Sequence, residues 1–489
     1  MTAEAEDRNS LRSAILTGVA WKVASQGTMT VVRIVGGLIL ARFVHPVDYG
    51  RAGMALAFSS LVIVFSDLAF GSTLVQRETV SERDRSTVFW LSLIGSCAFG
   101  LMGYLLAGSA ARLVGRTDVT PLLQVVALTF PIAGIATVPV AILGRALDFR
   151  RLEIRQIASS LIGIVAGVAV AVDGGGAWAF IVQLIAAAAS STVIVCVMAR
   201  WVPRHGISRA SARNLAGFSA NVVLHRLLYY VHRNADTVLI GRYLGAAPLG
   251  AYTLAYNVML IPFYRISAVV QEVLFPAFSR MQSDPRKIAE LWLRSMRVVG
   301  AISVPALLGL IAIAPDFIPV VLGAQWKQAI TVLQVLSWVG LIQSLQTSTT
   351  DVMLAVDRSE LLRTYSIVFF CAHLLAFVIG VQYGILGVAI AYAISSSIVE
   401  PLQTVLACRV LGVSPWRVAV SLRGVMEAAG AMFVLVLGLR WLLVAQTAFG
   451  AEARLVLCIA GGIVAAALLM HWRVPELMQE ARLLKARAR

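Results

Sequence analysis

Residues 177–199 read AWAFIVQLIAAAASSTVIVCVMA, a stretch without one charged side chain. A helix needs about 20 apolar residues to cross a hydrocarbon core roughly 30 Å thick, and this stretch is long enough. Its apolar residues follow one another instead of alternating with polar ones, which favours a helix over a strand of a membrane barrel. The stretch therefore predicts a membrane-spanning helix.

Similar apolar stretches recur on both sides of it along the whole chain. Of the 489 residues, 59% are hydrophobic and 13% are charged, whereas a soluble domain carries about 25% charged residues. We predict an all-α integral membrane protein of about 14 transmembrane helices, with no loop long enough for a folded soluble domain. The predicted spans are 14–43, 49–75, 86–112, 119–143, 155–172, 177–199, 214–244, 249–275, 296–322, 328–355, 362–381, 384–408, 418–443 and 454–472.

The net charge of +16 reflects an unequal distribution of basic residues. If the N-terminus lies inside, most Lys and Arg residues fall in segments that the span order also places inside, such as 145–155, 200–213 and 473–489. This asymmetry predicts a multi-pass protein with both termini in the cytoplasm. The basic segments meet anionic membrane lipids, so the charge predicts no nucleic-acid partner.

The chain also repeats itself at a shift of 200 residues. Leu40-Ala-Arg-Phe-Val44 aligns with Ile240-Gly-Arg-Tyr-Leu244. The identities in this register are Arg33/Arg233, Arg42/Arg242, Gly50/Gly250 and Ala55/Ala255. Because an even number of spans separates the copies, we predict two six-helix lobes related by a pseudo-twofold axis along the membrane normal, plus two extra helices. Such an arrangement is typical of transporters.

The predicted domains follow from this repeat. They are a cytoplasmic N-terminal segment (1–13), an N-lobe (14–200), a cytoplasmic inter-lobe loop (201–213), a C-lobe (214–410), the two extra helices (411–472) and a cytoplasmic basic tail (473–489).

Polar side chains inside the predicted spans form the candidate site. A charge at mid-span costs about 2.5–3.5 kcal/mol on insertion scales, so it should face a cavity or a partner. At 100° per residue, matching helices of the two lobes carry such residues on one face. We predict a cationic cavity that binds an anionic group through Lys22, Gln26, Arg33, Arg226, Arg233 and Arg265. The candidates for lining the cavity or for coupling are His225, Tyr229, His232, Asp236, Asp67 and Asp351.

The residues also permit other interpretations. The cations can pair with carboxylates such as Asp236 as packing contacts, or extend to the membrane interface. The histidines can couple transport to protons, or can be neutral hydrogen-bonding side chains in a polar groove. Asp67, Asp351 and Glu400 each stand alone in the sequence, which favours hydrogen bonding between helices over cation coupling.

The sequence carries no pattern for covalent chemistry. It has neither the GxxxxGKS/T loop that binds ATP nor the HExxH or Cys/His spacing that binds zinc. The five cysteines lie singly in apolar stretches, where helix packing is their ordinary role. We therefore predict a protein that is not an enzyme and has no cofactor.

Two longer stretches match a known pattern. One begins at Ala41-Arg-Phe-Val-His-Pro-Val-Asp-Tyr-Gly50 and continues to Arg77; the other begins at Asn234-Ala-Asp-Thr-Val-Leu-Ile-Gly-Arg-Tyr-Leu-Gly245 and continues to Arg280. Both resemble bacterial Wzx-type polysaccharide exporters. The branch they resemble is the colanic-acid-exporter-like one of the multidrug/oligosaccharidyl-lipid/polysaccharide flippase superfamily.

The resemblance implies a function. A protein of this family moves a polyprenyl-pyrophosphate-linked oligosaccharide, the repeat unit of a polysaccharide, from the inner to the outer leaflet of the bacterial plasma membrane by alternating access. Lys22, Arg33, Arg226 and Arg233 match the place of its anion-binding cations, and a polymerase and export machinery are its expected partners. The alternatives are an ion-coupled drug/cation antiporter of the same superfamily, whose cavity would favour acidic residues, and a non-transporting component of a glycan-assembly complex.

Overall fold

The computed structural model describes residues 27–66, 74, 80–208, 234–281, 284–356, 359–446 and 449–474. Side chains are described in these ranges except at 60–66, 263–277, 279, 280 and 359. Every regular element of the described part is helical, and nine of its helical segments are long and apolar enough to cross a membrane. The multi-pass helical fold is thus confirmed, whereas the total of about 14 helices remains a prediction.

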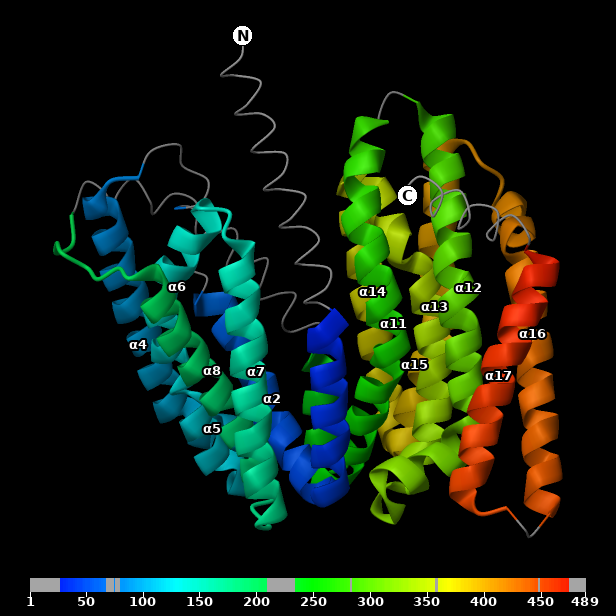
Figure 1. Ribbon diagram of the computed structural model, residues 1–489, viewed down its shortest axis with the longest axis horizontal. Coiled ribbons are helices and arrows are strands. Elements are labelled where there is room, and N and C mark those ends of the chain that lie inside the picture. Colours follow the sequence, from blue (N-terminus) through cyan, green and yellow to red (C-terminus); the bar gives the residue numbers. More distant parts are fainter. Residues whose placement is uncertain are drawn as a thin grey trace. The chain divides into compact units, whose positions relative to one another are not determined.

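The chain divides into two compact units, Met1–Gly250 and Ala251–Arg489, and the division falls inside α11 (Ala246–Arg280). The first unit contains a helix over 27–43, α2 (Pro46–Ser66), α4 (Glu82–Leu113), η1 (Thr117–Val119), α5 (Thr120–Val126), α6 (Thr129–Arg145), α7 (Phe149–Val172), α8 (Trp178–Ala199) and a helix over 234–243 (Figure 1). The predicted span 119–143 is interrupted at residues 127–128, so α5 and α6 share it. The predicted domain limits remain a prediction.

The second unit continues from α11 to the end of the described chain (Figure 1). Its further elements are α12 (Pro285–Phe317), η2 (Ile318–Leu322), η3 (Ala324–Trp326), α13 (Ala329–Ala355), α14 (Ser359–Gly380), η4 (Val381–Tyr383), α15 (Gly384–Leu411), α16 (Pro415–Ala445) and α17 (Ala451–Arg473). Within this unit α12 packs on α13 and α16, α15 packs on α13 and α14, and α16 packs on α17.

Several helices begin at side chains that cap the free backbone N–H groups of the first turn. Ser81 and Asp84 form a reciprocal capping box at the start of α4. Asp284 accepts a hydrogen bond from the backbone N–H of Lys287 at the start of α12. At the other end of a helix, Gly412 terminates α15 with φ 67°, a left-handed conformation that glycine adopts without strain.

Helices of the first unit pack through small residues. A Cβ added to Gly134 of α6 would lie 2.0 Å from the Ser96 hydroxyl oxygen of α4, and one added to Gly163 of α7 would lie 2.7 Å from the Gln183 carbonyl oxygen of α8. Such close approach is typical of membrane helices, because their association depends on van der Waals packing more than on apolar burial.

The helix that contains the start of the ninth predicted span, 296–322, is longer than that span predicts. The structure extends α12 back to Pro285, across residues that lie between the eighth and ninth predicted spans. Ile288, Trp292 and Met296 are buried at four-residue spacing and pack with residues of α13, α15 and α16. The Trp292 indole N–H also donates to the Thr349 hydroxyl at 3.2 Å. This tertiary packing keeps the segment helical despite its charged outer face.

Candidate functional site

Of the twelve side chains that the sequence predicts at the site, the structure describes Arg33, Asp236 and Asp351. Lys22, Gln26, Asp67, His225, Arg226, Tyr229, His232 and Arg233 lie outside the described residues, as does the side chain of Arg265. The cationic cavity therefore remains a prediction.

Arg33 and Asp236 lie on two different helices of the first unit. Arg33 is exposed on the helix over 27–43. Asp236 is half-buried on the helix over 234–243, where its Oδ1 accepts from the backbone N–H of Thr237 at 2.6 Å and from the Thr237 hydroxyl at 3.3 Å. The carboxylate of Asp236 is thus held at least in part by its own helix.

The turns that open α2 and α11 pack directly on each other within the first unit. A Cβ added to Gly50 would lie 1.8 Å from the carbonyl oxygen of Ala246, and one added to Gly250 would lie 1.9 Å from that of Pro46. The contact is reciprocal at a shift of 200 residues, the register in which the sequence repeats. Glycine at both positions permits the two backbones to approach this closely.

Polar side chains gather where α13, α14 and α15 meet in the second unit. We call this set the polar interface; it comprises Gln343, Gln346, Thr350, Asp351, Tyr365, His373, Tyr392, Ser396, Glu400, Gln403 and Thr404, all buried or half-buried. Three hydrogen bonds join α13 to α15: Gln343 to the Tyr392 hydroxyl at 2.8 Å, Thr404 to Gln346 at 2.9 Å and Gln403 to Thr350 at 2.9 Å.

Two carboxyl groups belong to the polar interface. Glu400 is 4% exposed, and the described side chains that act on its carboxyl are Gln343 and Tyr365. Asp351 is half-buried, and its Oδ2 is buried without a hydrogen-bond partner. In the sequence each of these carboxyls stands alone among apolar residues, whereas in the structure both belong to one polar interface between helices.

A buried ion cluster joins three helices at another place in the second unit. Asp316 of α12 is 5% exposed and accepts from Arg440 Nε of α16 at 2.6 Å and from Arg454 Nη2 of α17 at 3.0 Å. None of these three residues was predicted as a site residue from the sequence. The sequence signal was Asp316 and Arg440, each set within an otherwise apolar stretch, because charges buried in a membrane require partners of opposite sign.

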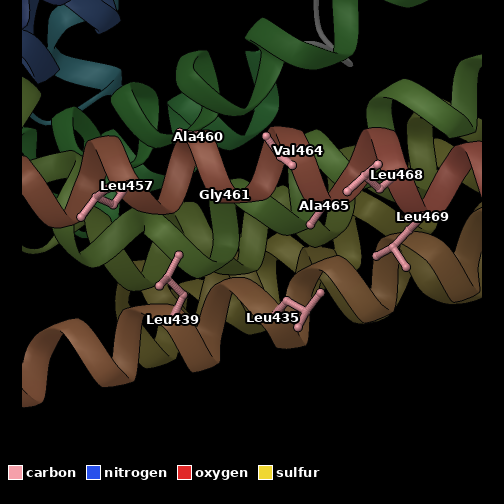
Figure 2. A pocket seen from close by; sticks show the side chains of 9 residues that line it. All are labelled: Leu435, Leu439, Leu457, Ala460, Gly461, Val464, Ala465, Leu468 and Leu469. Atoms are coloured by element: carbon pink, nitrogen blue, oxygen red, sulfur yellow. The ribbon is translucent and has the colours of Figure 1, made fainter.

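An apolar groove runs between α16 and α17, with a volume of about 630 Å³. Figure 2 shows the side chains that line it, all aliphatic apart from one glycine. They are Leu435 and Leu439 of α16 and Leu457, Ala460, Gly461, Val464, Ala465, Leu468 and Leu469 of α17. Because Ala460, Gly461 and Ala465 of α17 have small side chains or none, the groove stays open between the larger leucine side chains. The groove is shaped for an aliphatic chain and offers no polar group to bind.

The family model and two relatives that match this chain are each named as a biosynthesis protein. Residues 39–331 match a family model described as polysaccharide biosynthesis protein. The lipopolysaccharide biosynthesis protein WzxC of Escherichia coli is 27% identical over 400 residues, covering 81% of this chain and 80% of the relative. The teichuronic acid biosynthesis protein TuaB of Bacillus subtilis is 27% identical over 391 residues, covering 79% and 81%.

The fold is also similar to a solved structure. The lipid II flippase MurJ, in an inward closed conformation, superposes with a TM-score of 0.73 over 94% of this chain and 100% of its own. The two sequences are 12% identical, so this likeness concerns the fold alone.

Proposed function

Because the chain belongs to the polysaccharide biosynthesis protein family, we propose that it flips a polyprenyl-pyrophosphate-linked oligosaccharide from the inner to the outer leaflet of the bacterial plasma membrane. The match over residues 39–331 carries this proposal. The same match and the relatives confirm the resemblance to Wzx-type exporters. The multi-pass helical fold and its likeness to a lipid II flippase agree with it.

The proposed mechanism is alternating access between two six-helix lobes, with both termini in the cytoplasm. The pyrophosphate would be held by the cationic residues Lys22, Arg33, Arg226, Arg233 and Arg265, with Gln26 beside them, because guanidinium and ammonium groups bind phosphate through charge-assisted hydrogen bonds. The exposure of Arg33 supports this role, since a guanidinium available to a ligand has to be accessible.

The groove between α16 and α17 supports a lipid-linked substrate. A polyprenyl chain is a flexible branched hydrocarbon, and a groove lined only by aliphatic side chains and glycine accommodates it without desolvating a polar group. We propose that part of this chain lies in the groove while the head group moves between leaflets. The polymerase and export machinery that use the flipped repeat unit are the further partners this function implies.

The test is translocation of a fluorescent polyprenyl-pyrophosphate oligosaccharide in proteoliposomes. We expect transport by the wild type and its loss in the double variant Arg33→Ala, Arg233→Ala. The matched control is Arg83→Ala, which removes an exposed cation from the first turn of α4 and is expected to transport like the wild type. All variants are compared at equal amounts of folded, inserted protein.

The outcomes separate the alternatives. Transport that survives the double substitution keeps the flippase and refutes the assignment of the two arginines. Failure of the wild type with several glycans, together with proton-driven efflux of cationic dyes, identifies an antiporter. Failure of both assays leaves the non-transporting component of a glycan-assembly complex.

A further inference from the structure

We propose that the Glu400 carboxyl, buried where α13, α14 and α15 meet, is a proton-binding site of this protein. The site takes up a proton from water to convert the carboxylate into a neutral carboxylic acid, and it gives the proton back in the reverse step. Asp351, at the other end of the polar interface, is the carboxyl through which the proton exchanges. The proposal rests on side chains of the second unit alone and does not depend on the proposed flippase activity.

The surroundings of Glu400 favour the neutral form. Its side chain is 4% exposed, and the described groups that act on its carboxyl, Gln343 and Tyr365, are uncharged. An ionised carboxylate buried without a cation loses its hydration and receives no compensating charge. Taking up a proton removes that penalty. This distinguishes Glu400 from Asp316, which is equally buried but has two arginine partners.

The Tyr365 hydroxyl supplies a partner for the added proton. It is buried next to the Glu400 carboxyl and interacts with it. A carboxylate can only accept hydrogen bonds, whereas a protonated carboxyl also donates one. The Tyr365 hydroxyl can donate to the carboxylate and can accept from the protonated carboxyl, so it is a hydrogen-bond partner for both forms.

Two pairs of neutral hydrogen-bonding side chains lie between α13 and α15 in the stretch from Glu400 to Asp351. Along α15 the residues after Glu400 are paired with α13 through Thr404 to Gln346 and through Gln403 to Thr350, and Thr350 directly precedes Asp351. The hydroxyls of Thr350 and Thr404 can each accept and donate at one oxygen, which a proton path needs. Asp351 is less buried than Glu400, and its Oδ2 has no hydrogen-bond partner. This oxygen is therefore available to bind a proton.

His373 is the nearest histidine on this interface and is held in a defined form. Its Nδ1 lies 2.8 Å from the Phe369 carbonyl oxygen, which can only accept, so Nδ1 carries a proton. Its Nε2 lies 3.2 Å from the Ser396 hydroxyl, one helical turn before Glu400. In its neutral form His373 accepts from Ser396, and no charged side chain is among the described groups that act on the Glu400 carboxyl.

No charged group of the other described helices is among those that act on the Glu400 carboxyl. The helices α12 and α16 pack on α15 at Ala407, Cys408 and Leu411, about two helical turns beyond Glu400. The basic residues beside those contacts are Arg294, Arg297 and Arg417. In α11, Arg265 and Glu272 have side chains outside the described part.

The test is infrared spectroscopy of the full-length protein in lipid, without substrate, as the pH is raised. At pH 7 exposed carboxyl groups are ionised, because their ordinary pKa values are near 4. We expect the wild type to retain the carbonyl stretching band of a protonated carboxyl, and Glu400→Gln to lose it. Glutamine keeps the shape and hydrogen bonding of the side chain but takes up no proton. Glu360→Gln, an exposed site in the first turn of α14, should leave the band unchanged.

Two further variants keep the proposal open to refutation if Glu400→Gln folds poorly. Tyr365→Phe removes the proposed acceptor and should shift the band, whereas Asp351→Asn should leave the band in place but slow its exchange in heavy water. A wild type without the band at pH 7 overturns the proton site. So does a band that persists in folded Glu400→Gln. If Glu400→Gln loses the band but Asp351→Asn exchanges at the wild-type rate, Glu400 remains the proton site and the path through Asp351 is refuted.

Discussion

Gly50 offers the sharpest test of the structure, because the atoms that an added methyl group would meet belong to the backbone. In the Gly50→Ala variant the new Cβ would lie 1.8 Å from the Ala246 carbonyl oxygen and 2.7 Å from its carbon. Ordinary contact begins at 3.4 Å, so the turns opening α2 and α11 would have to separate by about 1.5 Å. No side-chain rotation relieves this clash.

The expected cost lies at the upper end of the range for overpacked sites. Overpacking costs about 1–3 kcal/mol when side chains can adjust, and here only backbone can move, so we expect about 3 kcal/mol. That corresponds to more than a hundredfold in the unfolding equilibrium. Gly250→Ala should cost a similar amount, since its Cβ would lie 1.9 Å from the Pro46 carbonyl oxygen. The double variant should cost less than the sum, because one separation of the turns relieves both clashes.

The assay is unfolding of the purified protein in mixed micelles with increasing denaturing detergent, followed by tryptophan fluorescence. Gly430→Ala is the control, because a Cβ there meets nothing within 4 Å, and alanine in a helix is about 1 kcal/mol better than glycine. We expect Gly430→Ala to be as stable as the wild type or more stable. If Gly50→Ala unfolds within about 0.5 kcal/mol of the wild type, the reciprocal backbone contact is refuted.

Three further substitutions test other contacts. Asp316→Asn should cost about 3 kcal/mol in the same unfolding assay, since it leaves two half-buried guanidinium groups without their counter-ion; equal stability would contradict the ion cluster. Hydrogen bonding to Lys287 lowers the pKa of Asp284, so its cap is present above the ordinary aspartate range and is lost as the pH falls through the lowered pKa. The protection of amide hydrogens in the first turn of α12, relative to their intrinsic exchange rate, should fall there, and Asp284→Ala should abolish that pH dependence. Trp201→Phe removes a hydrogen bond of 2.6 Å to the Glu82 carboxylate and should cost about 1.5 kcal/mol, with faster proteolysis of residues 201–208 as the readout.

The spans were predictable where length and apolar composition decide the helix. The predicted span 328–355 corresponds to α13 (Ala329–Ala355), and 177–199 to α8 (Trp178–Ala199). The start of α12 was not predictable in this way. Its first turns carry Arg286 and Lys287 among charged neighbours, and what keeps them helical is the burial of Trp292 against other helices. Hydropathy along one segment holds no information about such packing.

The candidate site was predictable only in part, for a related reason. An acidic residue within an apolar stretch can be identified from the sequence, and Asp351 and Glu400 were both identified in this way. What surrounds each carboxyl depends on partners far along the chain, such as Gln343 for Glu400 and the arginines for Asp316. Sequence spacing does not distinguish a paired carboxylate from an unpaired one, although their chemistry differs entirely.

The ion cluster at Asp316 has a consequence for how the chain is made. Its partners Arg440 and Arg454 lie 124 and 138 residues further along, so at about 5–20 residues per second the ribosome completes α12 roughly 6–30 s before they exist. During that interval the carboxylate has to stay near the lipid head groups or be sheltered by the insertion machinery. The helices α16 and α17 thus complete the ion cluster of the second unit, and a chain truncated before them would present an unpaired charge to membrane proteases.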